Sequence, residues 1–299
     1  MLKQVRILVC VSLFAILPVI GNSSESIAAE RVASQPARSP AVFRLAVRQL
    51  EELSRRSDVS IESLAAKRKE VDQLGAARYS HLSGLYWYTD FEQAVLEARR
   101  TNKPILNLRL MGDLRDEYSC ANSRYFRTIL YSDPAIAEVL GRDFILYWQS
   151  VRDVPKITIE FSDGRKLCGT ITGNSIHYVV SSDGSILDAF PGLYEPKIFL
   201  RHLKQCTGLD KLYLQLSAEQ RTTWLKANYR RRLTELTTVW GRHLATVAAK
   251  AAEVKGEDPQ LAAAEVTATA SAASRLSVTK RRMTEAQLMN RLVQTVDAL

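Results

Sequence analysis

Cys120 is the residue whose type and position best suit chemistry. It lies within Lys103–Asp133, where we expect a buried strand over residues 105–110, a polar loop, and a helix that begins at the cysteine. The unpaired N–H groups and the dipole of a helix N-terminus favour thiolate over thiol, and Ser123 can donate a hydrogen bond to that thiolate. Further positive charge nearby comes from Arg115, Arg124 and Arg127. The alternative is a buried, unreactive cysteine that caps the helix.

His177 and Cys168 are the candidates to assist Cys120. His177 follows Ser175 by two residues, so both share one face of a strand, and His177 could act as a base or a cation for the thiol. The alternative is a core histidine whose hydrogen bonds are satisfied. Cys168 could resolve a disulfide, although a small buried apolar side chain is the simpler interpretation.

The remaining polar groups near Cys120 do not suggest a bound metal. The expected loop carries three acids that we interpret as a solvated cluster, Asp113, Asp116 and Glu117. Ligation by Cys120, His177 and one of these acids would lack any defined ligand spacing, so we expect no metal and no cofactor. Cys206 falls at the end of a later helix and is expected to be remote.

Two helices are expected ahead of this stretch. Ser39 and Pro40 provide an N-cap and a first helical residue, and a second helix runs from Ser60 to Gly75. Their expected apolar stripes are Val42, Ala46, Leu50 and Leu53 in the first helix, and Ile61, Leu64, Ala65 and Val71 in the second. Together they predict a helical hairpin, which could pack on the main domain or on another chain.

The segment from Leu85 to Cys206 has the pattern of an α/β domain. A capping box at Thr89–Glu92 opens a helix that ends at Asn102. After the cysteine helix we expect a short helix from Asp133 to Gly141 and a strand over 144–149. Two hairpins follow, over 156–171 and 176–190, each turning at Ser-Asp-Gly, and a closing helix over 196–205. Beyond it, residues 217–254 and 259–299 have helical composition.

Residues 87–205 resemble the thioredoxin superfamily, in particular its exported thioredoxin-like branch. The matching features are Trp87, the helix 89–101, Lys103-Pro104, the strand 105–110 and Ser132-Asp133-Pro134. The resemblance places the family's nucleophilic cysteine on Cys120 and its second cysteine on Ser123, which gives a Cys-x-x-Ser motif. The loop over 111–119 is longer than usual in the family, and Ser119 replaces the tryptophan commonly found before the first cysteine.

The resemblance also assigns a substrate-binding bend. Counting back from Asp183-Gly184, the family's cis-proline position falls on Ser175, so we expect a trans peptide there, because a non-proline cis bond costs about 3–4 kcal/mol. Asn174, Ser175 and His177 are then the expected substrate-binding residues, with Cys120 and Ser123 catalytic. The expected fold is a thioredoxin-like three-layer α/β domain over 85–206, with a linker and helical hairpin over 30–84 and a helical extension over 207–299.

Two main functions remain open. With Ser123 in the second position, a mixed disulfide cannot be resolved inside the motif, which leaves monothiol oxidoreductase or isomerase chemistry on protein or small thiols. The alternative is a non-catalytic binding or structural module of the cell envelope, which engages an envelope protein through its helical arms. A third option is a thiol sensor in which Cys120 pairs with Cys168 or with a second protomer.

The first 29 residues predict export. Lys3 and Arg6 precede an apolar run over 7–20, and small residues follow up to Ala29, which is the order of a cleaved signal peptide. An uncleaved N-terminal anchor is the alternative; after cleavage we expect no integral membrane domain and a periplasmic or secreted protein. The full chain has a formal net charge of +9, without a basic block interleaved with aromatic residues, so nucleic-acid binding is not expected. Three cysteines follow the signal, and an odd number means that at least one is free or shared.

Overall fold

A computed structural model describes residues 38–170 and 173–255 of the 299-residue chain. In the last described helix it gives the backbone alone at positions 236, 239–240 and 242–255. The expected signal peptide and the expected helix over 259–299 therefore lie outside the described residues.

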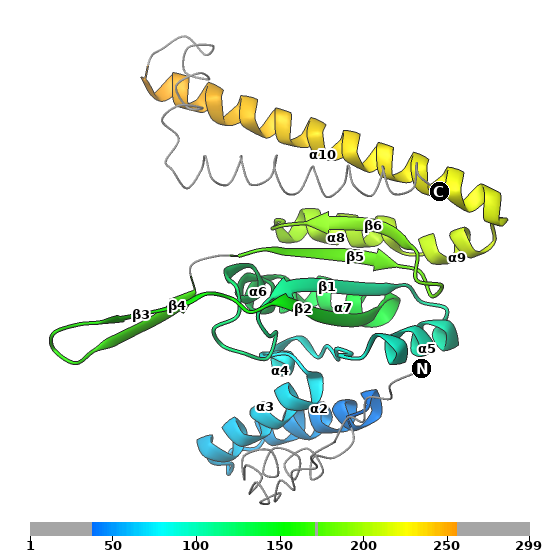
Figure 1. Ribbon diagram of the computed structural model, residues 1–299. Coiled ribbons are helices and arrows are strands. Elements are labelled where there is room, and N and C mark those ends of the chain that lie inside the picture. Colours follow the sequence, from blue (N-terminus) through cyan, green and yellow to red (C-terminus); the bar gives the residue numbers. More distant parts are fainter. Residues whose placement is uncertain (1–37, 171–172, 256–299) are drawn as a thin grey trace, which may run out of the picture. The chain divides into compact units, whose positions relative to one another are not determined.

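A mixed four-stranded sheet forms the centre of the domain (Figure 1). Its strands are β1 (Ile105–Met111), β2 (Ile145–Arg152), β5 (Ser175–Val180) and β6 (Ile186–Pro191), in the order β2-β1-β5-β6. β1 is parallel to β2 and antiparallel to β5, and β6 is antiparallel to β5. The expected α/β class is confirmed, and the second expected hairpin is the β5–β6 pair.

Helices cover both faces of this sheet. α5 (Phe91–Thr101) buries Ala94 and Ala98 against one face, where Ile105 and Tyr147 lie. The other face carries the larger core, in which Leu106 and Leu108 of β1 are fully buried. Its helices are α6 (Ala121–Tyr125), the π-helix η1 (Phe126–Leu130), α7 (Pro134–Asp143) and α8 (Pro196–Cys206). The cysteine helix is thus interrupted by a wide turn, a feature that often marks functional sites.

Local capping signals placed most helix ends correctly. Asn102 ends α5 in the left-handed conformation, at a φ of 53°. The N-cap of α5 is Asp90, whose side chain accepts a hydrogen bond from the Gln93 N–H, so the expected capping box beginning at Thr89 is displaced by one residue. Gly141 does not end α7, which continues to Asp143. Gly141 does not adopt the positive φ of a glycine that terminates a helix.

The N-terminal helices form the expected hairpin. They are α2 (Pro40–Ser54) and α3 (Ile61–Gly75), followed by the short α4 (Ser80–Ser83), and Phe43 packs with Leu50 and Val71 between them. Ala46, Leu50 and Val71 are buried as expected, but Phe43 is buried in place of Val42, and Ile61 and Ala65 of the second expected stripe are exposed. The hairpin packs on its own domain, since the Trp148 Nε1–H donates to the Ala76 carbonyl at 2.8 Å.

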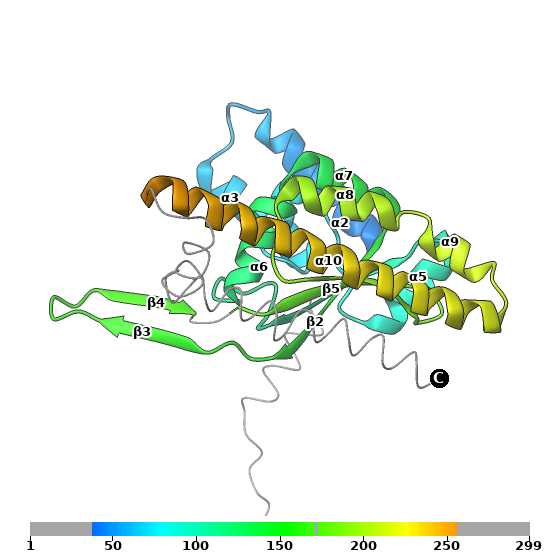
Figure 2. The ribbon, with the colours of Figure 1, turned by 90° about the horizontal axis from the view of Figure 1, so that it is seen from above.

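The strands β3 (Lys156–Glu160) and β4 (Lys166–Thr170) form a separate two-stranded sheet, as the first expected hairpin (Figures 1 and 2). Both views show this hairpin extending away from the four-stranded sheet. Every residue of β3 is exposed. The hairpin therefore contributes no residue to either face of the main core.

The C-terminal extension begins with α9 (Leu209–Leu214) and continues as the 38-residue α10 (Ala218–Lys255). α10 is anchored on β6: Asn228 donates to the Leu187 carbonyl at 2.6 Å, and Arg232 Nε lies 3.2 Å from Asp188 Oδ1. The side chains of Arg232 and Asp188 are both almost fully buried. Within residues 38–170 and 173–255, no helix is both long and apolar enough to cross a bilayer.

Candidate functional site

Cys120 caps the helix that follows β1, as predicted. Its Sγ accepts a hydrogen bond from the Ser123 N–H at 3.4 Å, and its S–H donates to the Asn174 carbonyl at 3.7 Å. The side chain is 0% exposed and belongs to the main core cluster. The cysteine is therefore where the sequence placed it, next to the expected bend, but it is sealed from solvent.

Ser123 does not donate to the sulfur. Its hydroxyl instead lies 2.9 Å from the Cys120 carbonyl oxygen and 2.5 Å from Ser119 Oγ. The expectation that the Ser123 hydroxyl donates a hydrogen bond to the Cys120 thiolate is therefore wrong. The short serine side chain donates to a backbone carbonyl within its own helical turn instead. The contact between these two residues is made by the backbone N–H of Ser123, as in an ordinary N-cap.

The bend after β4 packs tightly against the cysteine helix. Asn122 Nδ2–H donates to Ser175 Oγ at 2.9 Å, and Ser175 is 5% exposed. A Cβ on Gly173 would lie 2.6 Å from Asn122 Oδ1, so this approach requires glycine. The expected trans peptide at Ser175 is confirmed, as the described residues contain no cis bond. Asn174 is exposed, whereas Ser175 lies beneath the helix and lines no open groove.

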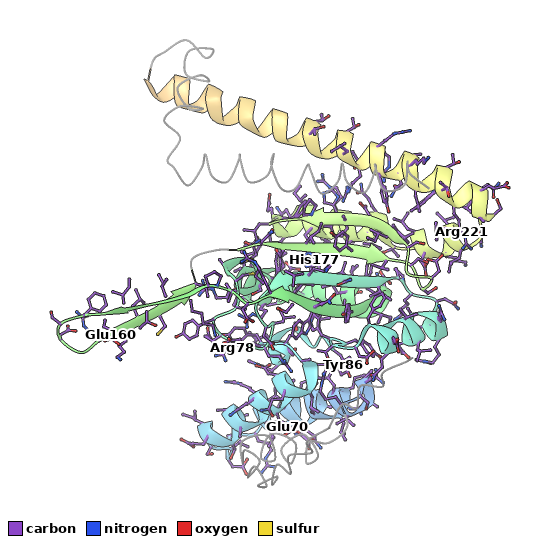
Figure 3. All side chains as sticks on the ribbon, in the orientation of Figure 1. Glu70, Arg78, Tyr86, Glu160, His177 and Arg221 are labelled. Carbon is purple, nitrogen blue, oxygen red and sulfur yellow. The ribbon has the colours of Figure 1, made fainter. Side chains whose placement is uncertain are left out.

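His177 is a core residue beneath the cysteine helix, at the middle of β5 (Figure 3). Its Nε2 lies 2.6 Å from Tyr131 Oη, and the rings of Phe126 and Phe199 pack around it. Burial lowers the pKa of His177 to about 3, so the imidazole is neutral and the expected cation role is wrong. Its Nδ1 has no partner in the described part of the chain.

Burial also raises the pKa of Tyr131 well above its usual value, and an electrostatic interaction with Cys120 raises it further. Tyr131 thus lies within electrostatic reach of the sulfur, whereas its hydroxyl is engaged with His177. Among the polar groups under the helix, His177 Nδ1 is left without a hydrogen-bond partner in the described residues.

Arg127 is the residue of this site whose role the sequence did not indicate. It is 2% exposed, and its guanidinium donates to Ser119 Oγ at 2.9 Å. The other acceptors are the carbonyl oxygens of Leu114, Asp116, Glu117 and Ser123, at 2.9 to 3.5 Å. These bonds fix the loop over 112–119 to the helix. A usable signal was present, because Arg127 lies seven residues after Cys120 and so on the same face of an ideal helix.

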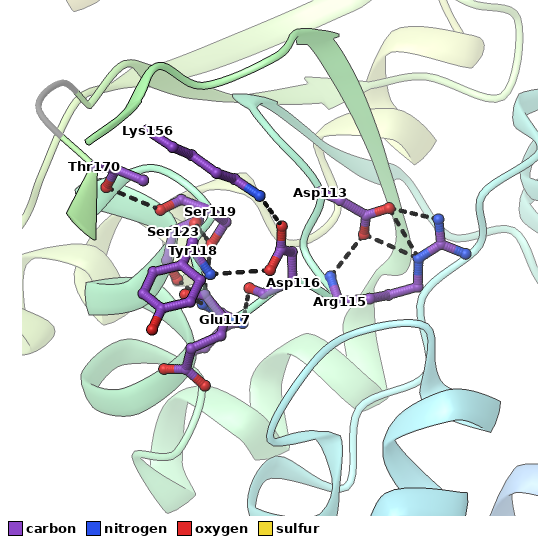
Figure 4. A network of polar contacts seen from close by, with 10 residues as sticks. Asp113, Arg115, Asp116, Glu117, Tyr118, Ser119, Ser123, Lys156 and Thr170 are labelled. Atoms are coloured by element: carbon purple, nitrogen blue, oxygen red, sulfur yellow. Dashed lines mark hydrogen bonds and ion pairs between the residues drawn. The ribbon is translucent and has the colours of Figure 1, made fainter. Parts of the chain in front are cut away.

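The loop acids are ion-paired rather than freely solvated (Figure 4). Asp113 pairs with Arg115, and Asp116 Oδ2 lies 2.8 Å from Lys156 Nζ at the base of the β3–β4 hairpin. The hydrogen bond from Lys156 is the main cause that lowers the pKa of Asp116. Glu117 forms the third pair, with Arg78. Asp116 and Glu117 therefore tie the loop to other segments, whereas the Asp113–Arg115 pair lies within the loop itself.

The other two described cysteines do not join Cys120, and all three are free. Cys168 is exposed on β4, so its interpretation as a buried apolar residue is wrong. It lies on the polar face of the hairpin, where Thr158 Oγ1 is 3.6 Å away. Cys206 is buried and remote, as expected, and donates to Asp188 at 3.4 Å; burial raises its pKa well above the usual value.

The structure brings together Cys120, Ser123 and Asn174 in direct contact, with Ser175 and His177 in the layer beneath. Within the described residues, no cluster of three or more histidine, cysteine or acidic side chains could hold a metal ion. No family model matches the chain, and a search of curated proteins finds no match either.

Proposed function

We propose that residues 85–206 form a thioredoxin-like domain of an exported protein, and that this domain serves as a non-catalytic binding module of the cell envelope. The fold proposal is supported by a strand–helix–strand unit followed by a hairpin and a helix in one mixed sheet. It is also supported by a cysteine at the first turn of the helix after β1.

The observation that carries the functional proposal is the sealed state of Cys120. The thiol has no exposed surface, and its sulfur both accepts and donates a hydrogen bond within the fold. A thiol exchanges with a disulfide only when the sulfur can be approached by its partner. Because the motif also lacks a second cysteine at Ser123, the domain keeps neither access nor an internal resolving group.

The binding role is supported by the β3–β4 hairpin. Ile157, Ile159 and Phe161 alternate along one strand and share a face, and Leu167 lies opposite Ile159. These four side chains are 41% to 56% exposed. An exposed apolar face of this kind marks interaction sites, and a protein partner with an apolar surface is the occupant it suits. The acidic side chains beside it are already paired, Glu160 with Lys166 and Asp163 with Arg165.

Thiol alkylation tests the proposal directly. In a Cys168→Ser variant of the full chain, the native protein should incorporate no label at Cys120 or Cys206 on a time scale on which unfolded chain labels fully. Unfolding should then expose Cys120 and Cys206 together. Mass spectrometry of the digested protein assigns each label to its cysteine.

Labelling of Cys120 in the folded Cys168→Ser protein would overturn the non-catalytic proposal. It would do so most clearly with a pH midpoint below the reference thiol pKa of about 8.5. A matched variant, Cys120→Ser in the same background, identifies any signal that comes from Cys206 instead.

Monothiol exchange is the second candidate, and one observation favours it. Cys120 contacts the Asn174 carbonyl, so the sulfur does lie against the bend that the thioredoxin resemblance assigns to substrate. This function requires the loop over 112–119 or the bend to move away from the sulfur. Mixed disulfides with client proteins that form in the native protein, and disappear in Cys120→Ser, would support it.

A further inference from the structure

α10 carries an apolar groove at its N-terminal end, apart from its contact with β6. The groove has a volume of about 440 Å³ and is lined by Leu216, Glu219, Gln220, Thr223, Trp224 and Ala227. Trp224 packs against Tyr213 on one side, with ring centroids 5.8 Å apart. Thr223 and Ala227 are exposed along the rest of the groove. The helix therefore presents a second apolar stripe that the domain itself does not cover.

The sequence after α10 has the signals of a helix that turns back. Gly256 follows the last described residue of the helix, and Asp258-Pro259 provides an N-cap and a first helical residue. At about 1.5 Å per residue, the 38 residues of α10 span roughly 57 Å, and a helix over residues 259–299 would span roughly 61 Å. A returning helix would thus run the whole length of α10 and end beside the groove.

The same arithmetic sets which residues would reach the groove. In an antiparallel pair that turns at 256–258, residues 287–298 lie level with Leu216 to Ala227. Apolar side chains recur here at Leu288, Leu292 and Val296, which places them on one helix face. The apolar stripe of the segment therefore coincides with the groove.

We propose that the groove on α10 is the docking site for the chain's own C-terminal segment, residues 259–299, with Leu288 and Leu292 against Trp224. A short connection holds this segment close to the groove, at an effective concentration that a free partner rarely reaches. This proposal is independent of the chemistry of Cys120. It implies that an envelope partner meets the α10 arm with this surface already filled.

Alkylation of an introduced cysteine tests the docking in the full chain. Thr223→Cys is placed in the groove of the Cys168→Ser protein, and Ala218→Cys, exposed in the first turn of α10 and not lining the groove, is the control site. We expect the combined changes Leu288→Asp and Leu292→Asp to accelerate labelling at position 223 by at least tenfold. Labelling at position 218 should stay unchanged, as should the effect of the off-stripe change Asn290→Asp.

Two results would overturn the proposal. The first is a labelling rate at position 223 that does not respond to Leu288→Asp and Leu292→Asp. The second is protection that weakens on dilution, since this would assign the groove to a segment of another copy. Far-ultraviolet circular dichroism of each variant establishes that faster labelling does not arise from an unfolded domain.

Discussion

Replacement of Arg127 by lysine is expected to destabilise the protein by about 2–6 kcal/mol, because this guanidinium holds the loop before the cysteine. It donates to five acceptors, which are four backbone carbonyls and Ser119 Oγ. Lysine has three N–H donors, so at least two acceptors lose their partner, and each buried unsatisfied group costs about 1–3 kcal/mol. Burial already lowers the pKa of Arg127, as expected for a cation without a carboxylate in direct contact.

The same substitution should loosen the loop over 112–119 and open a route to the sulfur. Leu114 of this loop is fully buried in the core cluster that contains Cys120. In the Cys168→Ser background, the Arg127→Lys protein should therefore be alkylated at Cys120 under conditions in which the Cys168→Ser protein is not. Urea unfolding gives the stability, and timed alkylation with peptide mapping gives the access to the thiol.

Arg124→Lys is the matched control, because Arg124 lies on the same helix and its guanidinium takes no part in this network. Arg124→Lys should change the free energy of unfolding by no more than about 0.5 kcal/mol, as is usual for changes outside the core. The rate of alkylation at Cys120 should stay the same within error. A loss of less than about 1 kcal/mol in Arg127→Lys, with Cys120 still protected, would refute the role that we assign to Arg127.

Three further predictions follow from buried groups. The pKa of His177 is about 3 in the folded protein and about 6.5 in the unfolded chain, so the unfolded chain binds the proton first and stability falls as the pH drops below 6.5. The loss of stability should reach about 2 kcal/mol at pH 5 and be absent in His177→Phe. Urea unfolding at several pH values measures it. Gly173→Ala should cost about 1–3 kcal/mol, since its Cβ would lie 3.2 Å from Asn122 N as well as against the side chain; an unchanged melting temperature would contradict this packing. Arg232→Met should lower the free energy of unfolding by about 3–5 kcal/mol, because it leaves the Asp188 carboxylate buried without its cation. Adding Asp188→Asn should recover part of that loss. Full additivity of the two changes in denaturant unfolding would argue against an interaction between Arg232 and Asp188.

The features that the sequence predicted well are those encoded over a few neighbouring residues. Ser39 caps α2 with Pro40 at its first position, and both Ser-Asp-Gly turns form, with φ of 85° at Gly164 and 94° at Gly184. These signals act within four residues, so their outcome does not depend on the rest of the fold. The helix start at Cys120 belongs to the same class.

The features that were missed depend on contacts between distant segments. Alternating apolar residues predicted the hairpin over 156–171, but not that it would stand apart from the main sheet with Ile159 and Leu167 exposed. Tyr131 was not foreseen as the partner of His177, because these residues are 46 positions apart. Without that partner, a neutral imidazole and a cationic one were equally consistent with the strand pattern.

The burial of Cys120 shows why position alone could not decide reactivity. A helix N-terminus favours a thiolate only if the charge remains solvated or is paired, and an apolar surrounding opposes ionisation. Here the carbonyls of the loop over 112–119 need hydrogen-bond partners once the loop folds against the core. Arg127 satisfies those carbonyls, and the positive charge that sequence reasoning assigned to the thiolate is thereby directed at the loop. The loop and the buried arginine therefore act together: each is costly alone, and in combination they keep Cys120 within the core.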